Sequence, residues 1–312
     1  MINKKDLSKI GIGTWGIGGF AERNPQNDDQ KQIEALAHMF RSGMNYVELN
    51  IWTSQGQSVE LASKGLEMSG VSRDKVFLSQ AIYSYTASTQ EQAEKELADL
   101  CKIFKTDYMD SISLTTTAIT EIGKEKVIEW YKKCLAENKV RYINLNNPSL
   151  ETLKEFHEIF GDKLFSIEIG FNFEIRENFD NGIIDYANKN DILCVIYQPL
   201  RRNRTALRNW PLLVELSEKY KKTQNQTLLN WITSKGMLPL TKSENIDHIN
   251  EHLESIKFEI DAKDIKKLDD FRPPNYTSPK VFWTQTGEGV RIDQLSNKFD
   301  EDYDNQNKNE SD

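Results

Sequence analysis

Hydrophobic positions follow two alternating spacings along most of the chain. Short apolar runs rich in β-branched residues recur, and each is followed by a longer segment whose apolar residues stand three or four positions apart. The short runs predict strands. There are eight of them, at residues 9–14, 46–49, 76–82, 109–114, 140–145, 164–170, 192–197 and 237–240. The intervening stripes predict amphipathic helices.

Helix-start signals support this alternation. Capping boxes are expected at Thr89 with Gln92 and at Thr223 with Gln226, and N-caps at Ser149 and Asp261. Eight strands alternating with helices predict an α/β fold, a (β/α)8 TIM barrel in which no strand edge is left open. Two helices fit between the seventh and eighth strands, at about 211–221 and 224–234, and two more follow the eighth, at about 246–255 and 262–271.

Length and composition fit one large soluble domain. The chain has 312 residues, of which 38% are hydrophobic, and no apolar run approaches the roughly 18 residues that a membrane span requires. The first ten residues lack the apolar core of a signal peptide, so we expect a cytoplasmic protein without a membrane partner. Cys101, Cys134 and Cys194 lack metal-ligand spacing, which favours buried free thiols.

The negative charge is concentrated at the C-terminus. The net charge is −8, and the last thirteen residues hold six acids and one lysine. We therefore predict a barrel over residues 1–275, an extension over 276–299 and a disordered acidic tail over 300–312. The remaining body is nearly neutral, which argues against a general nucleic-acid binder.

A glycine-rich motif near the N-terminus has two interpretations. The run from Gly11 to Gly16 fits G-x-G-x-x-G, the fingerprint of a dinucleotide-binding Rossmann unit. That fingerprint needs a helix beginning in the motif, whereas the polar stretch AERNPQNDDQ follows here. Glu48, near the end of the second strand, resembles the acid that this fingerprint requires, but its spacing from the glycines is too long. The first strand of the barrel and its loop are the favoured interpretation.

Five segments together resemble the aldo/keto reductase family. They are GIGTWGIGG, NYVELNIWTSQGQSVE, KVFLSQA, DYMDSISLTT and LTKSENIDHINEH, within a resemblance that covers roughly residues 8–271. The resemblance implies a barrel with extra helices after the seventh and eighth strands. It also implies NADP or NAD as cofactor and the reduction of a carbonyl group.

The positions of the family's catalytic tetrad are all substituted. The resemblance aligns Glu48 with the family's Asp, Thr53 with Tyr, Ala81 with Lys and Thr115 with His. In the family the Tyr protonates the carbonyl oxygen while the Lys lowers its pKa. Neither threonine nor alanine can do this, which leaves Glu48 as the one reactive side chain of the four. Tyr83 is either a displaced phenol or an aromatic that packs at the barrel mouth.

The cofactor side of the resemblance is better kept. Asn147 matches the family asparagine that holds the carboxamide, Glu168 stands for a glutamine, and Phe171 stands for the tyrosine that stacks on nicotinamide. Further expected contacts are Gln198, Leu200, Arg201, Lys242, Ser243, His248 and Glu251. His248 and His252 replace the usual Arg and Asn, so recognition of a 2′-phosphate is weakened.

Charged and metal-binding patterns leave alternatives open. Arginines crowd the stretch after the seventh strand: Arg201, Arg202, Arg204 and Arg208. They form either an anion cradle with Lys242 or a solvated loop with salt bridges. His248 and His252 share a helical face but have no neighbouring acid or cysteine to complete a metal site, so no metal is expected.

Two functional hypotheses follow from the sequence. The first is a barrel that binds a nicotinamide dinucleotide or another phosphate-bearing ligand without standard carbonyl reduction, as a binding, regulatory or partner subunit. The second is an active NAD(P)H-dependent oxidoreductase or lyase whose proton-transfer site is rebuilt from Glu48, Tyr83 or the substrate. Partners are then a small molecule or a dinucleotide, with a protein partner also open.

Overall fold

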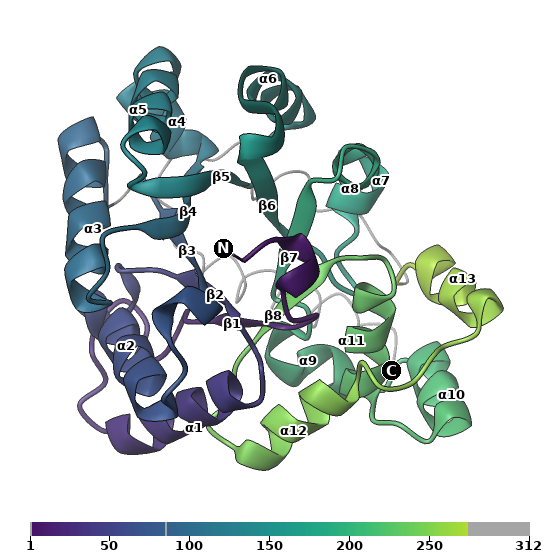
Figure 1. Cartoon of the computed structure of the whole chain (residues 1–312). Coiled ribbons are helices and arrows are strands. Elements are labelled where there is room, and N and C mark those ends of the chain that lie inside the picture. Colours follow the sequence, from purple (N-terminus) through teal and green to yellow (C-terminus); the bar gives the residue numbers. More distant parts are fainter. Residues whose placement is uncertain (1, 85, 274–312) are drawn as a thin grey trace, which may run out of the picture. The chain divides into compact units, whose positions relative to one another are not determined.

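A computed structural model describes residues 2–84 and 86–273 of the chain. Eight parallel strands close into a barrel in sequence order, each pairing with the next and β8 pairing with β1 (Figure 1). The strands are β1 Gly11–Gly13, β2 Tyr46–Leu49, β3 Phe77–Ile82, β4 Met109–Thr115, β5 Val140–Asn146, β6 Leu164–Gly170, β7 Leu193–Tyr197 and β8 Leu238–Thr241. The predicted TIM barrel is confirmed. The predicted extension over 276–299 and the predicted acidic tail over 300–312 lie outside the described residues.

The helices surround the barrel (Figure 1). They are α1 Asp29–Arg41, α2 Gln57–Ser69, α3 Gln90–Ile103, α4 Thr116–Ile122, α5 Lys124–Ala136, α6 Leu150–Phe160, α7 Glu177–Asp180, α8 Ile183–Lys189, α9 Arg204–Leu207, α10 Pro211–Tyr220, α11 Gln224–Thr233, α12 Ile246–Glu254 and α13 Ala262–Asp270. The predicted pairs of helices after β7 and β8 are present as α10, α11, α12 and α13. The short helix α9 precedes them and was not predicted. None of the described helices is both long and apolar enough to span a bilayer.

The capping predictions hold at three of four starts. Thr89 and Thr223 each form a capping box, and the Ser149 side chain accepts a hydrogen bond from the Thr152 N–H. Asp261 occupies the N-cap position of α13 but makes no capping hydrogen bond. Its carboxylate instead accepts a hydrogen bond from the Lys219 ammonium at 2.9 Å, because α10 packs alongside.

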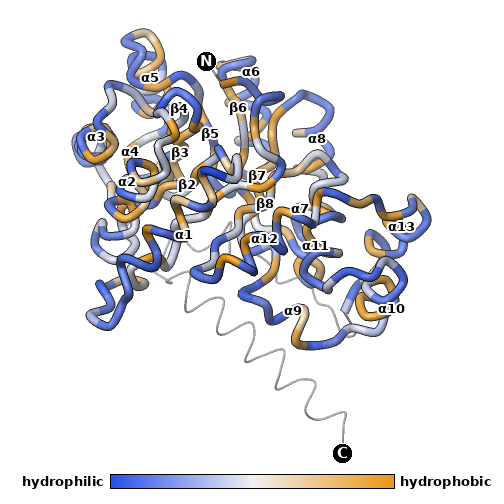
Figure 2. Tube along the Cα trace, turned by 60° about the horizontal axis from the view of Figure 1, so that its bottom comes forward, coloured by the Kyte–Doolittle hydropathy of each residue, from blue (hydrophilic) through white to orange (hydrophobic). Residues whose placement is uncertain are grey.

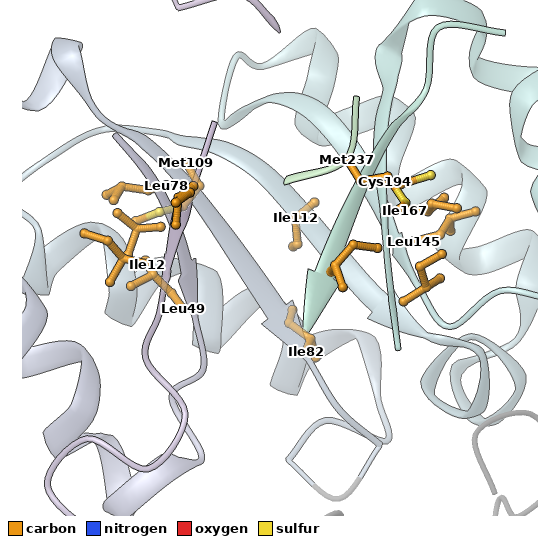
Figure 3. Packing of buried hydrophobic residues seen from close by; sticks show 14 of the residues in the cluster. Ile12, Leu49, Leu78, Ile82, Met109, Ile112, Leu145, Ile167, Cys194 and Met237 are labelled. Atoms are coloured by element: carbon orange, nitrogen blue, oxygen red, sulfur yellow. The ribbon is translucent and has the colours of Figure 1, made fainter. Parts of the chain in front are cut away.

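The main hydrophobic core lies between the strands and the helices. Outward-facing strand residues such as Ile12, Leu78 and Ile167 are fully buried there. Figure 3 shows Ile12 and Leu78 in one group of these side chains and Ile167 in another. Hydrophilic stretches lie mostly toward the periphery, while hydrophobic ones recur along the strands (Figure 2). Cys134 and Cys194 are buried free thiols as predicted, whereas Cys101 is only half-buried.

A second, smaller core closes the N-terminal end of the barrel interior. Tyr46, Phe77 and Phe165 stack in series, with ring centroids 5.3 Å and 4.7 Å apart. The register of β5 and β6 shifts between Ile143 and Asn144, at the level of Phe165. We call Tyr46, Phe77 and Phe165 the aromatic floor. It lies at the end of the barrel opposite the C-terminal ends of the strands.

Candidate functional site at the barrel mouth

Interior side chains of an eight-stranded barrel fall into layers that alternate between odd and even strands. The register follows from pairs such as Gly13 with Glu48 and Asn146 with Glu168. One layer consists of Glu48, Ser113, Glu168 and Leu240, and the next layer toward the C-terminal ends consists of Gly13, Ala81, Asn146 and Tyr197. These two layers form the inner wall of the mouth.

Two buried carboxyl groups share the lower of these layers. Glu48 on β2 is 4% exposed and Glu168 on β6 is 2% exposed. Burial raises the pKa of Glu48 to about 7, although the Thr14 N–H, 3.4 Å from Oε2, acts in the opposite direction. Burial and the negative charge of Glu48 raise the pKa of Glu168 well above its usual range. No cation of the described chain lowers the pKa of either carboxyl.

The other three substituted tetrad positions hold side chains without acid–base function. Thr53 lies in a 3-10 turn, Thr53–Gly56, and is fully buried. Ala81 is buried on β3. Thr115 ends β4, and its hydroxyl accepts the Ala118 N–H at 3.2 Å, which caps α4. Of the four positions, Glu48 alone carries a titratable side chain.

Asn147 is held rigidly at the rim. Its backbone has a φ of 49°, in the left-handed region that asparagine tolerates. Its side-chain amide donates a hydrogen bond to Asn146 Oδ1 at 2.7 Å, and its Oδ1 accepts one from the Tyr197 hydroxyl at 2.9 Å. The backbone N–H of Asn147 donates to the Glu168 carbonyl at 2.9 Å. These bonds fix the amide beside the layer that contains Glu168.

The structure does not bring Phe171 to the mouth. Its ring is fully buried next to Trp231, with centroids 5.0 Å apart, and packs outside the barrel with Phe179. Tyr197, at the end of β7, is the half-buried flat ring at the mouth, and sequence reasoning missed it. The alternation of β7 contains the signal, because Val195 and Tyr197 point inward while Cys194 and Ile196 point outward.

Lys242 marks the outer rim after β8. Its ammonium lies close to the loop after β1, 2.9 Å from the position of a Cβ built on Gly16. The surrounding protein and the nearby guanidinium of Arg202 lower the pKa of Lys242. The guanidinium of Arg202 stacks over Trp15 and Phe20, at 4.6 Å and 5.2 Å from the ring centroids. Two cations thus stand next to each other at the rim.

The arginines after β7 lie in two different environments. Arg201 and Arg208 both pair with the carboxylate of Glu174, which is 1% exposed and also accepts a hydrogen bond from Trp210 Nε1 at 2.7 Å. Burial acts to raise the pKa of Glu174, but the two guanidinium groups hold it below its usual range. Arg201 therefore belongs to a salt-bridge network. Arg202 is the arginine that lies beside Lys242.

The remaining predicted cofactor contacts lie on the segments that follow β7 and β8. Gln198 is half-buried, with a φ of 52°, and Leu200 is buried. The Ser243 hydroxyl accepts the Asn245 N–H at 3.0 Å. The Glu251 carboxylate accepts a hydrogen bond from Thr223, which ties α12 to the start of α11.

His248 and His252 differ in environment. His248 is exposed, whereas His252 is buried, and burial lowers the pKa of His252 to about 4. Within the described residues, no three His, Cys, Asp or Glu side chains gather as a metal site. Tyr83 lies half-buried just beyond the end of β3.

The strands and helices form a (β/α)8 barrel with a candidate ligand site at its C-terminal end. The sequence profile of the aldo/keto reductase family matches residues 9–273, and the chain belongs to this family. The expectation from the resemblance is thereby confirmed at the level of the family.

Known relatives are distant in sequence. The chain is 25% identical over 215 residues to the NADPH-dependent alpha-keto amide reductase of Saccharomyces cerevisiae, which covers 66% of this chain and 68% of that protein. The thermostable aldo-keto reductase Tm1743, solved with the inhibitor epalrestat, superposes with a TM-score of 0.75 at 22% identity, over 84% of this chain and 94% of that one. An aldo-keto reductase from Klebsiella pneumoniae in complex with NADPH gives 0.73 at 20% identity, over 88% and 94%.

Proposed function

We propose that this chain binds a nicotinamide dinucleotide, NADP(H) or NAD(H), across the barrel mouth without carrying out standard carbonyl reduction. The juxtaposition of Lys242 and Arg202 carries the proposal. Two like charges at one rim repel each other, and no carboxylate of the described residues lies within ion-pair distance of the Lys242 ammonium. A pyrophosphate or 2′-phosphate at this rim would compensate the positive charge of Lys242.

Further support comes from the neighbouring amide and ring. Asn147 and Tyr197 lie on the barrel side of the mouth. There Asn147 offers hydrogen bonds to a carboxamide, and the Tyr197 ring offers a surface on which a nicotinamide ring can stack. A relative from yeast is NADPH-dependent, and a barrel from Klebsiella pneumoniae was solved with NADPH. This chain shares the family and the fold with these proteins.

The limits on chemistry come from the barrel interior. Standard reduction in this family uses a phenol beside an ammonium group, and this chain has Thr53 and Ala81 at those positions. A threonine hydroxyl is a far weaker acid than a phenol, and alanine carries no charge that could stabilise an alkoxide. We therefore assign the mouth a binding role and expect no turnover of simple aldehydes at the family's ordinary rates.

Titration of the full chain with NADPH and with NADH tests the proposal. Binding is followed by tryptophan fluorescence, because Trp15 lies against Arg202 at the rim, and by calorimetry. We expect saturation below about 1 mM, in the range usual for such ligands. Lys242→Ala should weaken binding, whereas Lys257→Ala, which removes an exposed lysine beyond α12, should not. The absence of saturation with both cofactors would refute the proposal.

One observation favours a second candidate function. A carboxyl group whose pKa is about 7 can donate a proton at neutral pH, and Glu48 is such a group. An oxidoreductase with Glu48 as its acid would oxidise NADPH in the presence of a suitable carbonyl or imine substrate, and Glu48→Gln would abolish this while NADPH binding persists. If NADPH binds but no member of a carbonyl and imine panel is turned over, the binding function stands alone.

A further inference from the structure

The layer that contains Glu48 and Glu168, here called the acid layer, is packed more tightly below than above. A Cβ built on Gly11, in the layer beneath, would come within 2.6 Å of Leu238 Cδ2 and 2.9 Å of Leu240 Cδ2. A Cβ built on Gly13, in the layer above, would meet only Leu240 Cβ, at 3.5 Å, among the described residues. Ala81 is the other small side chain of the upper layer. Among the described residues, room for at least one added carbon atom is therefore present at Gly13, on the mouth side of the two acids.

The same region carries buried polar atoms that have no hydrogen-bond partner among the described residues. Within the described residues, Ser113 Oγ in the acid layer, Glu168 Oε2 in the acid layer and Asn144 Oδ1 in the layer beneath have no hydrogen-bond partner. All three side chains are at most 2% exposed. The Asn144 amide nitrogen donates a hydrogen bond to Ser79 Oγ at 3.3 Å, so Oδ1 of the same amide faces away from Ser79. Glu168 Oε2 and Asn144 Oδ1 are acceptors, and the Ser113 hydroxyl can accept or donate, so an N–H donor can satisfy all three. The unpaired amide nitrogen of Asn146, in the layer above, needs an acceptor instead.

We propose that Glu48 and Glu168 bind the protonated amino group of a small ligand that enters through the barrel mouth. An ammonium group has three N–H donors, which match two opposed carboxylates and the Ser113 hydroxyl. It also supplies the positive charge that two carboxyl groups in one buried layer lack. The Tyr197 ring, in the layer above, borders the space for the remainder of the ligand. This proposal rests on the proposed function only in that both use the same mouth.

Proton release accompanies binding of this kind. A cation favours the ionised form of both carboxyl groups, so the site must give up the protons that it holds when empty. The titratable groups that face the pair are Tyr46 from below and Tyr197 from above, and neither is ionised near neutral pH because burial raises both pKa values. Affinity for an ammonium ligand should therefore rise with pH through about 7, the pKa of Glu48.

Propylammonium chloride is a suitable probe for the full chain. Its binding is measured by calorimetry and by thermal unfolding at pH 8 and at pH 5.5, against equal concentrations of tetramethylammonium chloride, which has no N–H donor, and of potassium chloride. We expect propylammonium to raise the unfolding temperature at pH 8 more than either control salt. Its affinity should fall about tenfold or more at pH 5.5, since the carboxyl groups then hold their protons.

Matched variants locate the site. Glu168→Gln removes one carboxylate and should weaken propylammonium binding by about tenfold or more. The variant is expected to fold, because it removes a buried carboxyl group that has no cation partner. Glu96→Gln is the control: Glu96 on α3 is also buried, and burial raises its pKa to about 7, but it lies outside the barrel interior. It should leave propylammonium binding unchanged.

Each outcome decides one point. Equal stabilisation by potassium and propylammonium would overturn the amine proposal in favour of an inorganic cation site, and an unaffected Glu168→Gln variant would overturn the assignment of the site. A parallel NADPH titration separates this inference from the proposed function. If NADPH fails to bind while propylammonium binds in a Glu168-dependent way, the proposed function fails and the amine site stands.

Discussion

The negative charge of Glu48 on β2 raises the pKa of Glu168 on β6, which stands opposite in the closed strand order. Both carboxyl groups are buried, and no ion pair of the described chain compensates them. Groups of this kind reduce the stability of the fold when they ionise. The interior of the barrel is therefore a source of pH dependence as well as a candidate binding site.

The first prediction concerns this pH dependence. Because the folded-state pKa of Glu48 is raised to about 7, the folded chain holds more protons than the unfolded chain between about pH 4.3 and pH 7. Stability therefore falls as the pH rises through this window and levels off above it. Glu48→Gln should be more stable than the parent chain at pH 8, by an amount on the order of 3 kcal/mol, and about equal at pH 4.5. Urea unfolding at both pH values measures this, with the exposed Glu34→Gln as control.

His252 is predicted to limit stability in acid. Burial lowers its folded-state pKa to about 4, below the value of about 6.5 in an unfolded chain. The stability that the neutral ring contributes is fully present above about pH 6.5 and is lost as the pH falls through 4. His252→Asn should therefore flatten the stability profile between pH 6.5 and pH 4, as measured by denaturant unfolding. An unchanged profile would contradict burial of a neutral ring.

Glu174→Gln should destabilise the chain strongly. The substitution leaves Arg201 and Arg208 without their buried carboxylate, and removing one partner of a buried ion pair costs about 3 to 5 kcal/mol. Guanidinium unfolding measures the loss. Glu244→Gln, at an exposed carboxylate, should change stability by less than about 0.5 kcal/mol. A small loss in Glu174→Gln would mean that the arginines find other partners.

Two glycines of β1 offer a matched pair. Gly11→Ala brings a Cβ against Leu238 and Leu240 and should cost about 1 to 3 kcal/mol by overpacking. Gly13→Ala finds room and should leave unfolding nearly unchanged. If the space above Gly13 holds a ligand, the same substitution should weaken binding of propylammonium. Thermal unfolding with and without the amine measures both effects.

Tyr197 is predicted to contribute to dinucleotide binding through its ring. Tyr197→Phe removes the hydrogen bond to Asn147 but keeps the flat surface, so the affinity for NADPH should change little. Tyr197→Ala removes the surface and should lower affinity by about 1 kcal/mol or more, the usual worth of an aromatic contact. Phe171→Leu, in the buried cluster outside the barrel, is the control for a general loss of aromatic packing. Equal NADPH affinities for Tyr197→Ala and the parent chain would remove Tyr197 from the site.

The fold could be predicted from the sequence because two periodicities alternate cleanly. The predicted ends of the last four long helices each lie one residue beyond the observed ends, as with α10, which ends at Tyr220. The first strand, predicted over six residues, has three, Gly11–Gly13. The short helices α4, α7 and α9 were missed because four to seven residues give too little periodicity to recognise.

The candidate site could be predicted only in part, because its decisive contacts join distant residues. Nothing local indicates that Glu174 pairs with arginines 27 and 34 positions further along the chain. The choice between Phe171 and Tyr197 likewise depended on which side of the barrel wall each ring faces. Glu48 was recognised as an unusual acid from its position, but its relation to Glu168 required the closed barrel.

The aromatic floor has a kinetic consequence. Tyr46, Phe77 and Phe165 fill one end of the barrel. A small ligand must therefore reach and leave Glu48 and Glu168 from the other end. A dinucleotide bound across that end would prevent a small molecule already bound beneath it from leaving. It would also prevent a small molecule that arrives later from entering. Binding of the two should then follow a compulsory order, small molecule first, and a saturating dinucleotide should slow both entry and escape.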